Sequence, residues 1–502
     1  MDAQSLRFPA GVRQAAPATS FWRPSWPLLV ALYVYLLTLY QGNFLQLLLL
    51  DGDTYWHIAT GRWILQNGVV PTADPFSHTM PGAPWTAHEW LSEVLLAIAH
   101  DRGGWEGVVA LVGVAFAVTA GLLMQALLRS MQPARALMLT VVAVLMTVPH
   151  LLARPHMLVL PLMMVWVIGL VRARDEGRLP NFWLLPVMAL WANMHLGFTL
   201  GIALTGWFAL EAAAEAWGSP SFRRVVVGWA SFGILAVACS LLTPHGIGGF
   251  AFTWQVLVEN EYALARISEW ASPNFHGFQP LQVWLLGGLG VALYQGLKLP
   301  VFRLVLLLGL LHLSLKHVRY VELLGLLGPL VVAKSFGEQW ARRDGRPPVA
   351  PGAGVSTGGL GAALLACLLV IAAPVVLARV KPLSPPSFAA PVQAIDAART
   401  EGMAGQKVLN AYGWGGFLIY AGIRPAIDGR AEMYGDPFCK EYFEAINLQG
   451  SDALERFLDR YAIRWTLLAP DTPAVALLDH LPGWRRIHAD KDAVAHVRVT
   501  PQ

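Results

Sequence analysis

Charged residues are scarce in this sequence. Asp, Glu, Lys and Arg together make up 14% of the chain, whereas hydrophobic residues make up 55%. A soluble globular protein carries about a quarter charged residues, so this composition excludes a chain that is soluble throughout. The net charge is only +4, and the positive residues sit in short clusters between apolar runs, which argues against nucleic-acid binding. The sequence therefore predicts a chain that lies in a lipid membrane for most of its length.

Other features that the sequence lacks exclude further classes of protein. The three cysteines, Cys239, Cys367 and Cys439, are far apart and two of them lie inside apolar runs, so no disulfide framework or zinc motif is implied. The sequence contains no phosphate-binding loop, dinucleotide-binding fingerprint or internal repeat. Residues 1–25 have no small-residue cleavage site after a short apolar core. We expect them to form a cytoplasmic tail before an uncleaved signal-anchor helix.

Long hydrophobic runs are abundant. A helix needs roughly 20 apolar residues to span a bilayer, and on this basis about eleven spans are predicted, several of them short. They lie at residues 26–48, 105–128, 136–149, 157–171, 181–194, 197–216, 225–242, 281–297, 300–315, 318–335 and 357–378. The transmembrane part is therefore predicted over residues 26–380.

The basic residues predict the orientation of these spans. With the N-terminus in the cytoplasm, every inner connection is basic, as the positive-inside rule requires. The inner clusters are Arg129 and Arg135; Arg172, Arg174 and Arg178; Arg223 and Arg224; Lys298 and Arg303; and Lys334, Arg342, Arg343 and Arg346. Because the number of spans is odd, the chain after residue 380 is predicted to lie outside.

Beyond a Pro-rich tether, the composition becomes that of a soluble protein. Strand-like runs at 407–411, 424–428, 464–469 and 493–499 alternate with helix-like runs at 436–448, 452–461 and 473–481. This alternation predicts a small α/β domain. The predicted fold class is therefore an α-helical polytopic membrane protein with a small extracytoplasmic α/β domain at residues 381–502.

The longest outer connection, residues 51–104, begins with two acids. Asp51 and Asp53 follow directly on the first hydrophobic run, where charges are costly to hold against lipid. Two carboxylates at this spacing can share a divalent cation, or one can act as a general base that the other orients. The alternative is a helix cap, with Asp53 or Thr54 starting an amphipathic helix in the interface. We expect a site role, and rank Asp53 ahead of Asp51.

Further candidates lie on the same predicted outer face. Glu89 either presents a second acid to the cavity or simply begins a helix, where its charge favours the dipole. Cations on this face could bind a phosphate or could anchor anionic lipids by snorkelling. These cationic candidates are Arg154, His156, Lys316, His317 and Arg319. The remaining candidates for substrate binding are His57, His78, His88, His195 and His245, of which the last two are better explained as hydrogen-bonded helix ends.

These motifs resemble those of bacterial membrane proteins in the Rgt-like branch of the GT-C glycosyltransferase superfamily. The shared segments are Asp51-x-Asp53-x-x-Trp-His-Ile-Ala-x-Gly61-Arg-Trp-Ile, Pro71-x-x-Asp74-Pro-Phe-Ser-His78, Trp85-x-x-His88-Glu89-Trp-Leu, Thr243-Pro-His-Gly246, Glu269-Trp, Lys316-His-Val-Arg-Tyr320 and Ile427-Asp-Gly-Arg-Ala-Glu-Met-Tyr-Gly435. The chain has Asp-Gly-Asp rather than adjacent acids, and His-Glu-Trp-Leu where many relatives carry Lys-Pro-Pro-Leu.

The resemblance implies a GT-C-like bundle in the bacterial inner membrane. Such an enzyme moves a hexosyl or pentosyl group, with inversion, from a polyprenyl-phosphate carrier to an extracytoplasmic glycan, lipid or protein. It implies that Asp51 or Asp53 is the base or a metal-linked carboxylate, that Glu89 is a second acid, and that the outer cations hold the carrier phosphate. The other interpretations are a transporter or flippase for lipid-linked saccharides and a non-catalytic assembly factor. A transporter would favour charges near the midplane and a repeat, and the sequence shows neither.

Overall fold

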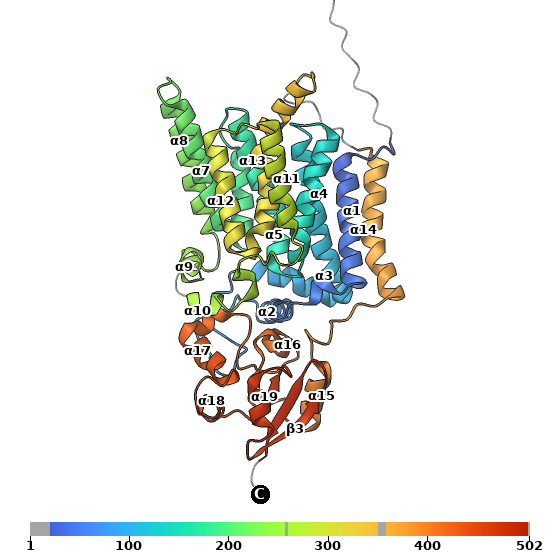
Figure 1. Ribbon diagram of the computed structural model, residues 1–502, viewed down its shortest axis with the longest axis vertical. Coiled ribbons are helices and arrows are strands. Elements are labelled where there is room, and N and C mark those ends of the chain that lie inside the picture. The colour runs from blue at the N-terminus through green and yellow to red at the C-terminus, as the bar shows by residue number, and fades with distance from the viewer. Residues whose placement is uncertain (1–20, 257–259, 350–357, 500–502) are drawn as a thin grey trace, which may run out of the picture.

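The computed structural model describes residues 21–256, 260–349 and 358–499. Figure 1 shows a bundle of long helices with a smaller unit of strands and helices at one end, and short helices between the two parts. This arrangement confirms the predicted fold class of a polytopic helical membrane protein with a small mixed α/β unit. The division of the chain at residues 25 and 380 stays a prediction.

Each of the eleven predicted spans overlaps a helix of the bundle. These helices are α1 (Trp26–Asn43), α3 (Trp90–Leu127), α4 (Pro133–Thr147), α5 (Pro155–Asp175), α6 (Leu185–Ala192), α7 (Phe198–Ala216), α8 (Phe222–Ser240), α11 (Pro280–Gln295), α12 (Val301–Lys316), α13 (Val321–Arg343) and α14 (Leu360–Val380). Among the described residues, six stretches are long and apolar enough to cross a membrane: Trp90–Leu127, Pro133–His150, Pro155–Asp175, Phe222–Ser240, Val318–Arg343 and Leu360–Val380. The chain is a multi-pass membrane protein.

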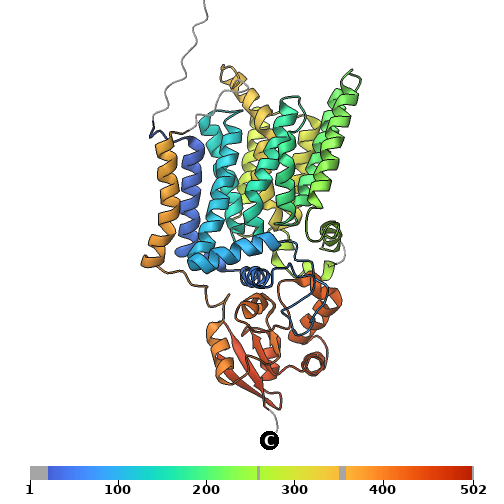
Figure 2. The same ribbon diagram turned by 180° about the vertical axis from the view of Figure 1, so that it is seen from behind.

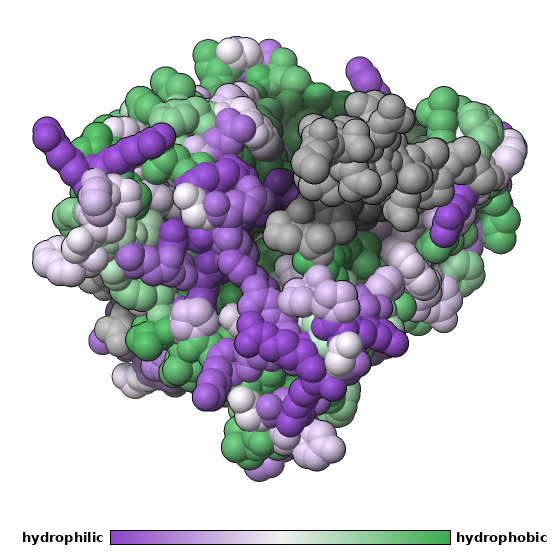
Figure 3. Space-filling view, turned by 90° about the horizontal axis from the view of Figure 1, so that it is seen from above, coloured by the Kyte–Doolittle hydropathy of each residue, from purple (hydrophilic) through white to green (hydrophobic). Residues whose placement is uncertain are grey.

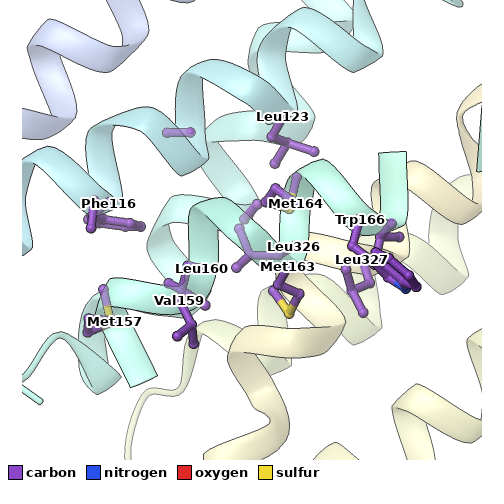
Figure 4. Close-up of a cluster of buried hydrophobic side chains, with 14 of the residues drawn as sticks. Phe116, Leu123, Met157, Val159, Leu160, Met163, Met164, Trp166, Leu326 and Leu327 are labelled. Carbon is purple, nitrogen blue, oxygen red and sulfur yellow. The ribbon is translucent and has the colours of Figure 1, made fainter. Parts of the chain in front are cut away.

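The centre of the bundle is apolar. Figure 4 shows Phe116 of α3, Leu160 and Met163 of α5 and Leu327 of α13 gathered in one cluster. The indole of Trp166 is also buried there, and its Nε1–H donates to the carbonyl of Gly201 at 3.0 Å. In a bilayer such close packing and satisfied polar atoms hold helices together, because lipid tails are as apolar as the side chains.

The predicted inner connections all lie at the end of the bundle away from the C-terminal strands (Figures 1 and 2). Arg303 of α12 donates to Glu211 of α7 at 2.8 Å and to Asp175 of α5 at 3.1 Å, which ties three helices together at this end. Figure 3 looks onto the same end and shows a band of hydrophilic residues crossing it. Which side of the membrane this end faces stays a prediction.

Short elements form a layer at the other end of the bundle. They are η1 (Leu47–Leu49), α2 (Asp53–Asn67), η2 (Val148–His150), α9 (Gly248–Trp254), α10 (Glu261–Leu264), η5 (Ser268–Trp270) and η6 (Val318–Tyr320), whereas η3 (Phe182–Leu184) precedes α6. The predicted outer connection 51–104 is thus mostly helical, and it includes the first part of α3. That part runs across the bundle end in Figure 2 before α3 turns at Gly104, whose φ of 62° and ψ of −152° break the helix.

The C-terminal part contains a four-stranded sheet with helices around it. Its elements are α15 (Val392–Thr400), β1 (Val408–Asn410), η7 (Tyr412–Trp414), α16 (Gly415–Tyr420), α17 (Ala431–Ile446), α18 (Ala453–Arg460), β2 (Trp465–Leu468), α19 (Pro473–Leu478), β3 (Trp484–Ala489) and β4 (Val494–Arg498). The strand order is β1-β2-β4-β3; β1 pairs with β2 in parallel, and the other pairs are antiparallel. The sheet is therefore mixed.

The strand predicted at 424–428 is wrong. The backbone of this segment is satisfied by a side chain instead of a neighbouring strand: Asn410 donates to the carbonyl of Ile427 at 2.9 Å and accepts from the amide of Ala426 at 2.8 Å. Strand β3 was not predicted, because its Arg485 and Arg486 are exposed and disguise the alternation expected of a strand.

Candidate functional site

Four side chains from three separate segments meet at the start of α2, and we call them the acid–arginine cluster. Arg154 Nη1 lies 3.0 Å from Asp51 Oδ2, and its Nη2 lies 2.9 Å from Asp53 Oδ2. The same Nη1 also bonds to Glu269 Oε1. The indole Nε1–H of Trp56 donates to the other oxygen of Asp53 at 3.0 Å. The structure therefore brings together the two predicted acids and one predicted cation.

Local backbone structure fixes this cluster. Asp51 accepts the amide of Asp53 at 2.7 Å and so supports the first turn of α2. The N-cap position itself is Gly52, not Asp53 or Thr54 as the cap interpretation had it. Arg154 immediately precedes α5, which begins with Pro155, a residue favoured at that position because it has no amide to satisfy. The amide of Ala153 donates to the carbonyl of Leu48 in η1 at 2.9 Å, which holds the arginine segment against the segment that carries the two acids.

Burial and neighbouring charges make Asp53 unusual. Burial and the negative charge of Asp51 together raise the pKa of Asp53 to about 7, against the opposing charge of Arg154. The Arg154 guanidinium instead holds the pKa of Glu269 down at about 2, despite the burial of that carboxyl group. About a fifth of the Asp53 side chain (19%) is exposed, so a second molecule can still reach it. Asp53 thus combines the proton affinity and the access that a general base needs.

Glycines let the C-terminal part approach these acids closely. A Cβ atom on Gly429 would lie 1.7 Å from Asp53 Oδ1, and one on Gly416 would lie 2.1 Å from the carbonyl oxygen of Gly52. A Cβ on Gly52 would in turn lie 1.9 Å from the carbonyl of Gly413. The glycine-rich segments around 413 and 429 therefore form one wall of the site.

A second group, the Glu89–histidine cluster, adjoins the first. Glu89 Oε1 lies 3.3 Å from His195 Nε2 and 3.6 Å from His88 Nε2, and Glu89 Oε2 lies 3.7 Å from His57 Nε2. The other ring nitrogen of His57 lies 3.2 Å from Glu93 Oε1. The predicted residues His57, His88, Glu89 and His195 are thus neighbours. The acid–arginine cluster is adjacent, because the ring of His57 lies tilted against that of Trp56 with 3.7 Å between the ring centres.

The three imidazole rings of the Glu89–histidine cluster differ in pKa. Burial raises the pKa of Glu89, but the imidazole of His88 and those of His195 and His57 outweigh it and bring that pKa below its usual range. Burial lowers the pKa of His57 to about 3 and that of His195 to about 4, so both rings are neutral at neutral pH. His88 is also buried, yet the charge of Glu89 raises its pKa. The Glu89 carboxylate therefore favours the charged form of His88 over that of the other two rings.

The predicted cations Lys316, His317 and Arg319 lie on one strip beside the acid–arginine cluster. The guanidinium of Arg319 stands 4.5 Å from the ring centre of Trp270, the neighbour of Glu269 in sequence. His317 Nδ1 contacts the carbonyl of Trp270 at 2.5 Å. The side chain of Lys316 is exposed. In the described part of the chain, no carboxylate lies within ion-pair distance of Lys316 or Arg319.

The other predicted histidines make backbone contacts. His78 Nε2 lies 2.9 Å from the carbonyl of Val408 in β1, so this residue ties the first outer connection to the C-terminal sheet. His245 Nε2 lies 3.2 Å from the carbonyl of Ala87, next to His88. His156 Nε2 lies 3.2 Å from the carbonyl of His150, just beyond Arg154. These contacts favour structural roles, and substrate binding by the three residues stays a prediction.

Sequence reasoning did not select several residues that the structure places at or beside the site. Glu269 completes the acid–arginine cluster, and Glu93 contacts His57 from the position one helical turn after Glu89, a spacing that could have identified it. Arg430 is fully buried between Asp74, at 2.8 Å, and Asp428, at 2.7 Å. The ion pair between Arg430 and Asp74 joins the first outer connection to the C-terminal part. No local pattern indicates this pair, because its two residues are more than 300 residues apart in sequence.

The residues do not fit a metal centre. In the described part of the chain, no group of three His, Cys, Asp or Glu side chains is arranged to hold an ion. The two acids that could have shared a divalent cation instead share Arg154. The cofactor therefore stays unknown.

Comparison with known proteins identifies relatives by fold. No family model and no curated protein sequence matches the chain. A solved structure of the archaeal oligosaccharyltransferase AglB from Archaeoglobus fulgidus, in complex with an inhibitory peptide and a dolichol-phosphate, superposes with a TM-score of 0.54 at 9% identity, over 88% of this chain and 69% of that one. ArnT from Cupriavidus metallidurans in the apo state superposes with a TM-score of 0.50 at 13% identity, over 95% of this chain and 98% of that one. The fold is GT-C-like.

Proposed function

We propose that the protein is a membrane glycosyltransferase that takes a sugar from a polyprenyl-phosphate carrier. Asp53 carries this proposal: it is a carboxylate at the end of the bundle, with a pKa near 7 and a partly exposed side chain. The GT-C-like fold supports it, because AglB of the same fold was solved with a dolichol-phosphate. The choice of a polyprenyl-phosphate sugar as donor rests on this similarity of fold and on the cations Lys316 and Arg319 beside the acid–arginine cluster.

Asp53 is suited to act on the acceptor hydroxyl. The carboxylate removes the proton as the hydroxyl oxygen forms its bond to the anomeric carbon of the sugar. The bond from that carbon to the phosphate oxygen breaks at the same time, and the polyprenyl phosphate leaves with the electron pair. A general base whose pKa lies near the working pH is effective, because it is ionised and still has a useful affinity for the proton. Asp51 and Arg154 act as positioning residues for this base.

The departing phosphate needs positive charge at the level of the lipid headgroups. Lys316 ends α12 and Arg319 lies within η6, over Trp270. Neither has a carboxylate within ion-pair distance among the described residues. Fixed cations placed where negative charge develops stabilise the transition state more than a mobile solvent does. Trp270 offers an aromatic face at the same place, and Arg319 packs over it.

A transfer assay tests the proposed function. The purified full-length protein is incubated in lipid nanodiscs with a panel of polyprenyl-phosphate sugars that carry a radiolabel in the sugar, and with candidate hydroxyl acceptors. We expect time-dependent loss of the label from the lipid and release of polyprenyl phosphate, both absent with Asp53→Asn. A flippase would move the intact lipid without cleaving it, and an assembly factor would bind without either reaction. Either result would overturn the proposal.

A further inference from the structure

The acid–arginine cluster gathers three carboxylates around one positive charge. Asp51 and Asp53 come from one segment and Glu269 from another, and each places one oxygen against the guanidinium of Arg154: Asp51 and Glu269 at Nη1, and Asp53 at Nη2. Carboxylate oxygens are also the usual ligands of divalent cations. Here the guanidinium of Arg154 bonds to all three.

A divalent ion does not fit beside this guanidinium. Oxygen ligands lie about 2.0 to 2.6 Å from Mg²⁺ or Ca²⁺, whereas the oxygens of Asp51 and Asp53 already accept bonds of 3.0 and 2.9 Å from Arg154. An ion at their centre would therefore contact a group that is always positively charged. The three carboxylates raise the pKa of Arg154 far above its usual range, despite its burial, so it cannot lose its proton to make room.

The arginine is held in place by its own backbone. The amide of Arg154 donates to the carbonyl of Leu152 at 2.8 Å, and the preceding amide of Ala153 is bonded to Leu48, as described above. Pro155 then fixes the start of α5. Because both sides of Arg154 are restrained, its side chain reaches the three carboxylates without a large loss of freedom.

We propose that Arg154 is the built-in cation of this site and replaces a divalent metal ion there. It holds Asp51, Asp53 and Glu269 in one geometry, and the chain neither needs nor binds a divalent ion at this position. The role of Arg154 in orienting Asp53 rests on the proposed transferase function. The exclusion of a metal by the guanidinium does not rest on that function, so the two can be tested separately.

The test uses Mn²⁺ as the probe and the full-length protein in nanodiscs. Binding is measured by electron paramagnetic resonance of free Mn²⁺ for the wild type, Arg154→Gln, and Arg154→Gln combined with Asp53→Asn. We expect the wild type to bind no Mn²⁺ at this site. Arg154→Gln should bind one Mn²⁺ ion, because the repelling charge is gone, and the double variant should lose this binding. Lys381→Gln, at the end of α14, is the matched control for removing one cation and should resemble the wild type.

Two further measurements complete the test. Chelator treatment should leave the transfer rate of the wild type unchanged. In Arg154→Gln the rise of transfer rate with pH should occur at higher pH, because Asp53 has lost a neighbouring positive charge and its pKa is higher. The proposal is overturned if the wild type binds Mn²⁺ and Asp53→Asn abolishes that binding, or if folded Arg154→Gln gains none. The wild-type measurement decides the question even if the variant does not fold. A wild type without transfer activity and without Mn²⁺ binding would refute only the proposed function.

Discussion

Asp51 and Asp53 are two residues apart, yet their surroundings give them different chemistry. Asp51 accepts the amide of Asp53 and one arm of Arg154, so its place is set by the start of α2. Asp53 is bound by Arg154 on one oxygen and by Trp56 on the other, and the C-terminal wall at Gly429 touches it. Asp53 therefore combines a raised pKa with a position between the bundle and the C-terminal part.

Replacement of Asp53 by Asn should abolish most transfer. Loss of a general base lowers the rate by about a hundredfold to ten-thousandfold, whereas loss of a cap costs about 1 kcal/mol of stability. We therefore expect Asp53→Asn to lose its turnover while its melting temperature at pH 8 is no lower than that of the wild type. Asp51→Asn should keep more activity and lose some stability. Initial rates and thermal unfolding in nanodiscs measure both effects, and near-normal transfer by Asp53→Asn would leave the first outer connection with a structural role only.

The pH dependence of transfer should follow Asp53. Its pKa is about 7 in the folded protein, so kcat/KM should rise with pH through about 7 and level off above it. In Asp51→Asn the rise of kcat/KM should occur at lower pH, because removing the negative charge beside Asp53 lowers the pKa of Asp53. The same raised pKa means that the folded state binds this proton more tightly than the unfolded state does. Stability is therefore lost as pH rises from about 4 through 7, and Asp53→Asn should remove that part of the loss.

The cations Lys316 and Arg319 should bind the carrier phosphate. Charge-assisted contacts contribute about 1.5 to 3 kcal/mol each, so replacing both residues with Gln should weaken the binding of polyprenyl phosphate by on the order of a hundredfold or more. Lys381→Gln serves again as the control, since Lys381 lies at the same end of the bundle but packs over Phe44. Equal binding by the wild type and the double variant would return the two cations to the role of lipid anchors.

At the scale of single elements, the packing of α16 against α2 explains why glycine recurs in the C-terminal motifs. Helix α16 begins at Gly415 and packs on α2, and the contact is backbone against backbone: Gly416 lies under the carbonyl of Gly52. A side chain at either position would separate the two helices. The element that carries Asp53 is thus positioned by an element more than 350 residues later in the sequence.

Gly416→Ala should disrupt this contact. Its Cβ would lie 2.1 Å from the carbonyl oxygen of Gly52, and such overpacking typically costs about 1 to 3 kcal/mol. We expect a lower melting temperature and a loss of transfer together. Gly413→Ala is the matched control, because a Cβ there meets no atom within 4 Å and the backbone does not require glycine. If the two variants behave alike, the close approach of α16 and α2 does not position the site.

At the scale of the whole molecule, the C-terminal part is joined to the bundle by buried charge. Arg430 is paired with Asp74 and Asp428, and its guanidinium stands 4.6 Å from the ring centre of Trp85. Removing one partner of a buried pair leaves a charge uncompensated, which is strongly destabilising. Asp436 adds a second tie by accepting the amides of Tyr262 and Ala263 at 2.9 and 3.0 Å. Such a unit acts as a fixed wall of the site.

Reporter fusions should establish the orientation of the bundle. A reporter active only outside the cytoplasm should be active when fused after residue 390 and inactive when fused near residue 175. The basis is that all predicted basic inner connections lie at one end of the bundle, opposite the C-terminal strands (Figure 1), and that basic connections face the cytoplasm. The reverse pattern would place the acid–arginine cluster in the cytoplasm and remove the reason for a lipid-linked donor.

The sequence by itself determined the membrane class, the approximate positions of the bundle helices, and the end at which polar residues gather. These properties depend on hydrophobic runs and on charge, which are local. It also selected Asp51, Asp53 and Glu89, because acids next to a hydrophobic run are costly unless they are used. Only the tertiary structure decided that Arg154 joins the two acids, that Glu269 and Glu93 complete the clusters, and that Gly416 and Gly429 press on α2. Those contacts join segments separated by up to several hundred residues, and no local pattern encodes which distant partner a side chain meets.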